Sequence, residues 1–78
     1  MDIQKFIENF AEQFDDTELD VFKPETVFHD LDEYSSIIAL SIISMVDEEY
    51  GVALGGNEMK SAVTIQDLFN IVQSKLGQ

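Results

Sequence analysis

Apolar residues recur at helical spacing in three stretches of the chain, and this pattern predicts an all-α protein. The first stretch covers residues 2–14, with Asp2 placed to cap its N-terminus. One face of this helix is expected to carry Ile3, Phe6, Ile7, Phe10 and Phe14. The second stretch covers residues 36–50 and is followed by Gly51, a residue type favoured just past a helix end. Its buried stripe is expected to contain Ala39, Ile42, Ile43, Val46 and Tyr50.

The last helix is predicted to begin after Thr64, whose hydroxyl suits an N-cap. Asp67 then stands at the third helical position, as in a variant of the capping box. The buried face of this helix is expected to consist of Ile65, Leu68, Phe69, Val72 and Leu76. Before it, Gly55 and Gly56 indicate a turn, and residues 58–62 are expected to form one short helical turn.

Residues 15–35 show no sustained period, are rich in acidic residues and are interrupted by Pro24. Several apolar residues are expected to pin this stretch to the core: Leu19, Val21, Phe22, Val27, Phe28 and Leu31. Long loops in compact domains are usually functional or mobile. We therefore predict one domain over residues 1–78, a small four-helix bundle with a short third helix and a long loop between helices 1 and 2.

Charge narrows the choice of partners. The 78 residues include 16 acids and four lysines but no arginine, which gives a formal net charge of −12. Such a chain repels nucleic acid and anionic membranes and is steered toward basic protein surfaces, so we expect neither nucleic acid nor membrane as a partner. The absence of cysteine excludes disulfides and thiolate metal sites. No apolar run approaches a membrane span and the start shows no export signal, so we expect a cytoplasmic monomer.

Candidate catalytic and metal-binding residues are few. The single histidine, His29, lies in the predicted loop near two serines, but no third partner accompanies them. We therefore expect His29 to be solvated and the protein not to be an enzyme. The pair Asp30 and Asp32 invites comparison with a calcium loop, but three of the required positions hold unsuitable residues, so we expect no metal site.

Ser35 and Ser36 stand where the second helix is predicted to begin. Either serine is a good N-cap, and a hydroxyl there lies where free N–H groups and the helix dipole favour an anion. A common side of this helix, away from the buried stripe, carries Ile37, Leu40, Ser41, Ser44, Asp47 and Glu48. That side begins apolar and ends acidic, as a docking surface for basic enzymes would. A helix buried on most of its circumference explains the periodicity equally well.

In their order and spacing, these segments resemble an acyl carrier protein over essentially the whole chain. The family has Asp-Ser-Leu at the start of its second helix and a run such as Glu-Glu-Phe-Gly at its end. Here Ser35-Ser36-Ile37 and Glu48-Glu49-Tyr50-Gly51 take these places. Upstream, Phe28-His29-Asp30-Leu31 is similar to the family's Phe-x-x-Asp-Leu with one residue fewer. Downstream, Thr64-Ile65-Gln66-Asp67-Leu68 resembles the entry to the family's last helix.

The resemblance implies a covalent 4′-phosphopantetheine arm on the signature serine, whose thiol holds acyl groups as thioesters for acyl-processing enzymes. Spacing to Tyr50 identifies Ser36 as the attachment site, whereas counting from Leu31 favours Ser35. Ser35 stands where the family has aspartate, a departure that bears on recognition by a phosphopantetheinyl transferase. The acyl cargo and the pathway stay open between fatty acid synthesis and specialised lipid or polyketide-type synthesis.

The alternative function is an acidic helical protein-interaction module without a prosthetic group, and the missing aspartate favours it. If the cargo is a fatty chain, we expect it to shelter inside the bundle. The expected lining of that shelter is Ile43, Val46, Ala62, Val63 and Leu68.

Overall fold

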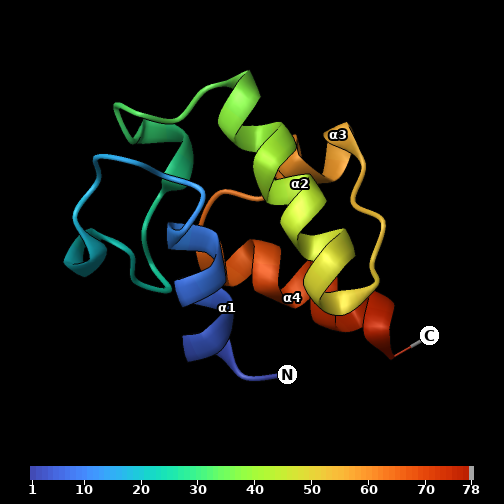
Figure 1. The fold of residues 1–78 in the computed structure, drawn as a ribbon. Coiled ribbons are helices and arrows are strands. Elements are labelled where there is room, and N and C mark those ends of the chain that lie inside the picture. The colour runs from blue at the N-terminus through green and yellow to red at the C-terminus, as the bar shows by residue number, and fades with distance from the viewer. Residues whose placement is uncertain (78) are drawn as a thin grey trace.

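Four α-helices and two short 3-10 helices make up the fold in residues 1–77, which are the residues that the computed structural model describes (Figure 1). In chain order they are α1 (Ile3–Ala11), η1 (Leu19–Val21), η2 (Phe28–Asp30), α2 (Ser36–Tyr50), α3 (Gly56–Ser61) and α4 (Ile65–Leu76). No strand forms in this range, only an isolated antiparallel bridge between Val27 and Thr64. The predicted all-α class is therefore confirmed. Helix α1 packs against α2 and α4, and α3 packs against α4.

Six phenylalanines dominate the core, and all six are buried: Phe6, Phe10, Phe14, Phe22, Phe28 and Phe69. Phe10 on α1 stands at their centre, with the ring centroids of Phe14, Phe22 and Phe28 between 5.4 and 6.1 Å away. Offset and edge-on ring pairs add to the stabilisation from burial. The aromatic residues of α1 and of the loop before α2 therefore form one packed unit.

Helix α1 begins where predicted but ends earlier. Asp2 caps it by accepting the Gln4 N–H. The helix stops at Ala11 rather than at residue 14, although Phe14 is still buried through a tight turn that follows. The reason lies far along the chain, because the Glu33 carboxylate accepts the N–H groups of the three residues after Phe14 and the Thr17 hydroxyl. These hydrogen bonds lower the pKa of Glu33 and turn the chain away from the helix axis.

The loop between α1 and α2 is pinned by fewer apolar residues than predicted. Phe22 and Phe28 are buried and Leu31 packs against the core, as expected. The prediction is wrong for Leu19, Val21 and Val27, whose side chains are exposed. A three-residue 3-10 helix turns only one side toward the core, and Phe22, directly after η1, takes that side.

Helix α2 has the predicted bounds. It begins after Ser35 and ends at Gly51, whose φ of 66° is a left-handed conformation that glycine adopts without steric cost. The predicted stripe faces the core, with Ile42 and Val46 fully buried and the other members packed at its edge: Ala39, Ile43 and Tyr50. Met45 is also buried, which widens the stripe beyond the prediction.

Near the end of the chain, α3 differs from the predicted bounds and α4 begins where predicted. Helix α3 begins at Gly56, two residues before the predicted short turn, because the Glu58 carboxylate accepts the Gly55 N–H and so fixes the helix start. Helix α4 has the predicted capping box, in which Thr64 and Asp67 exchange hydrogen bonds of 3.1 Å. Leu76 does not join the buried face and is exposed in the last turn.

Candidate functional site

The two serines at the entry to α2 have different surroundings. Ser35 is the N-cap, and its Oγ accepts the Ile38 N–H at 3.3 Å. Ser36 is the first helical residue and is exposed, and its hydroxyl makes no hydrogen bond within residues 1–77. Sequence reasoning treats both as N-cap candidates, and the structure separates a capping hydroxyl from a free one.

Backbone donors remain open at the same place. The Ala39 N–H bonds to the Ser35 carbonyl at 2.9 Å, while the Ile38 N–H is taken by the Ser35 side chain. The N–H groups of Ser36 and Ile37 find no acceptor in the part of the chain that the structure describes. Free first-turn N–H groups and the helix dipole favour an attached anion, so a phosphodiester on Ser36 fits these surroundings.

An apolar cavity of about 460 Å³ opens beside Ser36. Its lining comes from α2, α3 and the segment before α2, and consists of His29, Tyr34, Ser36, Ala39, Leu40, Ile43, Gly56, Met59 and Lys60. The Tyr34 phenol is partly desolvated, and this burial raises its pKa. A wall of this composition suits an apolar chain and offers few hydrogen bonds to a polar one.

This cavity differs from the shelter that the sequence predicts. Only Ile43 of the five expected lining residues borders it. Val46, Ala62 and Leu68 are buried in the packed core instead, whereas Val63 is 53% exposed. The earlier start of α3 explains the difference, because it brings Gly56 and Met59 next to α2 and turns Ala62 into the core.

His29 is exposed in the segment before α2, as expected, but it is also hydrogen-bonded to residues of α3 and the segment after it. Its Nε2 lies 3.0 Å from the Met59 carbonyl oxygen and 3.1 Å from that of Ala62. Both partners only accept, so Nε2 carries the proton and donates it to them. The ring stacks on Phe28 at a centroid distance of 4.4 Å and meets Tyr34 edge-on at 5.0 Å. His29 therefore ties the segment before α2 to α3 and forms one wall of the cavity.

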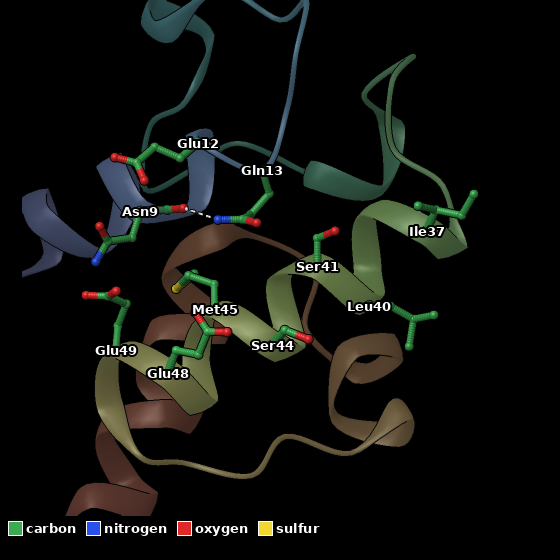
Figure 2. Close-up of a pocket in the computed structure, with 10 residues that line it drawn as sticks. All are labelled: Asn9, Glu12, Gln13, Ile37, Leu40, Ser41, Ser44, Met45, Glu48 and Glu49. Atoms are coloured by element: carbon green, nitrogen blue, oxygen red, sulfur yellow. Dashed lines mark hydrogen bonds between the residues drawn. The ribbon is translucent and has the colours of Figure 1, made fainter.

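A neighbouring side of α2 borders a second hollow of about 440 Å³, which we call the outer groove (Figure 2). Its lining joins α2 to the end of α1: Asn9, Glu12, Gln13, Ile37, Leu40, Ser41, Ser44, Met45, Glu48 and Glu49. Ile37 and Leu40 lie at the serine end of this side and are 75% and 64% exposed. The carboxylates of Glu48 and Glu49 stand at the other end, near Asn9 (Figure 2).

The outer groove agrees with most of the predicted α2 side. Of the six residues predicted for that side of α2, five line the outer groove, and Asp47 is exposed but does not line it. The interpretation of α2 as buried around most of its circumference is wrong, because this side is open. Sequence reasoning missed the contribution of α1, since nothing in the spacing of Glu12 or Gln13 shows which helix lies beside them.

Other kinds of site find little support in residues 1–77. No three histidine or carboxylate side chains in this range come close enough together to hold a metal ion. No helix in it is long and apolar enough to cross a membrane. Comparison of the chain with protein-family models, curated proteins and solved structures gave no match.

Proposed function

We propose that this chain is an acyl carrier protein, with 4′-phosphopantetheine attached covalently to Ser36. One observation carries the proposal: an exposed serine hydroxyl without a hydrogen bond stands at the first residue of α2, in the lining of an apolar cavity. Ser35 is the weaker candidate, because its Oγ is engaged as the helix cap.

The residues present fit such a group. The free N–H groups of Ser36 and Ile37 would stabilise the phosphodiester. When bound, the arm supplies a terminal thiol that carries an acyl group as a thioester. The cavity walls formed by Ala39, Ile43 and Met59 would keep an apolar acyl chain out of water. The four helices would form the bundle expected of a carrier.

The protein would deliver its cargo to enzymes and perform no chemistry itself. His29 is the only histidine, and its Nε2 proton points to the carbonyls of Met59 and Ala62, so this nitrogen is not placed to accept a proton from Ser36. A phosphopantetheinyl transferase and acyl-processing enzymes with basic surfaces would dock on the outer side of α2. There Ile37 and Leu40 supply apolar contact, and Glu48 supplies charge.

The second candidate is an acidic interaction module that carries no prosthetic group. The exposed Ile37 and Leu40 favour it, since they would serve as a docking surface whether or not Ser36 is modified. Under either function the net charge of −12 argues against nucleic acid and anionic membranes as partners, and we propose a monomer working in the cytoplasm.

Intact mass separates the two candidates. Incubation with a broad-specificity phosphopantetheinyl transferase and coenzyme A should add one phosphopantetheine to the wild-type protein. Ser36→Ala should abolish the addition, and Ser35→Ala, the matched control, should retain it. Addition that depends on Ser35 would move the site by one residue. No addition to a correctly folded wild-type chain would favour the interaction module.

A further inference from the structure

A second apolar surface lies on the long loop, away from α2. Leu19, at the start of η1, is 63% exposed, and Val21 at its end is 40% exposed. Figure 1 shows η1 at the edge of the molecule, with α1 between it and α2. Two hollows flank Thr17 here, one of about 360 Å³ that Leu19 borders and one of about 500 Å³ that Val21 borders. We call Thr17 to Val21 the loop surface.

The loop surface is held in place on both sides. Before it, the Glu33 carboxylate accepts the Thr17 N–H at 3.0 Å and the Thr17 hydroxyl at 2.8 Å. After it, the Thr26 hydroxyl donates to the Val21 carbonyl at 2.7 Å and accepts the Lys23 N–H at 2.9 Å. These bonds fix the backbone that carries Leu19, so binding a partner there costs less backbone entropy than it would on a mobile loop.

Charge restricts the partner that would cover Leu19. Residues 8–21 contain six acids and no lysine or arginine. Both flanking hollows have carboxylates in their lining, with Glu8 and Glu12 on one side and Asp16 and Asp32 on the other. A second copy of this chain would bring like charges together, and a nucleic acid or an anionic membrane would be repelled.

We propose that the loop surface is a second protein-docking site, which takes an apolar side chain flanked by lysines or arginines on a partner protein. Leu19 supplies the apolar contact, and the surrounding carboxylates select for basic neighbours. Because Leu19 and Val21 line neither the outer groove nor the cavity beside Ser36, one partner can hold the protein through the loop while another reaches Ser36. The site itself does not depend on the proposed modification of Ser36.

The test follows backbone amide shifts of the ¹⁵N-labelled, unmodified protein during titration with a helical peptide built of leucine and lysine. Amides of residues 16–21 should shift and saturate. Leu19→Ser should weaken the affinity measured at these amides about tenfold. Leu76→Ser is the matched control, since Leu76 is 45% exposed in the last turn of α4 and takes part in none of the surfaces described above, and it should leave the affinity at the loop unchanged.

Two results would overturn the proposal. One is a titration in which amides of α2 shift and those of residues 16–21 do not. The other is a loop affinity that Leu19→Ser leaves unaltered, which would show binding by charge alone. Circular dichroism of both serine variants should match the wild type, because neither side chain is buried. Failure here would leave the mass test on Ser36 unaffected, because the titration uses unmodified protein.

Discussion

Replacing His29 with alanine should destabilise the protein and loosen α3. The change removes the Nε2 donor shared between the Met59 and Ala62 carbonyls, as well as the ring stacked on Phe28. One shared N–H counts as about one net hydrogen bond, worth roughly 0.5–1.5 kcal/mol. An aromatic pair adds a similar amount. Since the residue is largely exposed, we expect a total loss of about 1–2 kcal/mol.

Thermal melting gives the size of this effect, and hydrogen exchange gives its location. For a domain of this length, about 1–2 kcal/mol corresponds to a fall in Tm of roughly 5–15 °C. The amide hydrogens of Met59 and Ala62, which bond to Gly55 and Glu58 carbonyls, should exchange faster in His29→Ala. Amides in the middle of α2 should change no more than the fall in global stability requires.

Two further variants test whether the Nε2 donor is responsible. The amide nitrogen of glutamine reaches about as far as Nε2, whereas that of asparagine reaches only about as far as Nδ1. His29→Gln should therefore recover part of the lost Tm, and His29→Asn should not. If His29→Ala has the same Tm as the wild type, His29 does not stabilise α3. Equal melting of the glutamine and asparagine variants would show that the ring, and not the hydrogen bonds, holds α3.

Three other outcomes are expected. Hydrogen bonds lower the folded-state pKa of Glu33 and Asp67 below their ordinary values of 4.5 and 3.8, so their contribution to stability is present above those values and lost as pH falls through the folded-state pKa. The urea concentration at the unfolding midpoint should therefore decrease when the pH is lowered below about 4, and this decrease should be smaller in Glu33→Gln. Ala62→Phe should lower the Tm of the unmodified protein, because Ala62 is 1% exposed and overpacking costs roughly 1–3 kcal/mol; an unchanged Tm would contradict the buried position. Asp47→Lys with Glu48→Lys should slow association with a basic partner enzyme in stopped-flow experiments and flatten its salt dependence, with helix content unchanged.

The sequence predicts best those features that depend on neighbouring residues. The ends of α2 follow from Ser35 and Gly51, and the start of α4 follows from Thr64 and Asp67. Each of these contacts spans four residues or fewer, so the spacing in the sequence already contains the geometry. The same is true of the phenylalanine face of α1, where helical periodicity identifies Phe6 and Phe10 as core residues.

Features that depend on distant residues could not be predicted in this way. Helix α1 ends early because Glu33 accepts hydrogen bonds from residues up to 18 positions away. His29 bonds to carbonyls 30 and 33 positions away. No periodicity reports such pairings, and both residues lie in the stretch where the hydrophobic pattern is least regular. The exposure of Leu19 was missed for the same reason, since the apolar character of a residue does not state which side of a short turn it occupies.

The sequence predicts only part of the candidate site. The serines at the entry to α2 are neighbours in the sequence, whereas the cavity is formed by residues that are far apart in it. Spacing located the entry to α2, but it left the outer side of the helix open between an exposed docking surface and a buried face. The cavity was misplaced, because three of the residues predicted to line it, Val46, Ala62 and Leu68, are packed in the core. The observed cavity lies nearer the start of α2, where Ala39 has only a small side chain and Gly56 has none.

Leu40 connects the two surfaces of α2 on which the proposed function depends. It lines the cavity beside Ser36 and also lines the outer groove. A partner that packs on Leu40 from the outer groove therefore contacts a side chain that also lines the cavity. Under the proposed function, the residue that anchors an enzyme is also one that borders the cargo. His29 borders the same cavity from the other side and holds α3 in place. The opening of the cavity would thus depend on His29, which hydrogen bonds hold in place, and on Leu40, which a docked enzyme would contact.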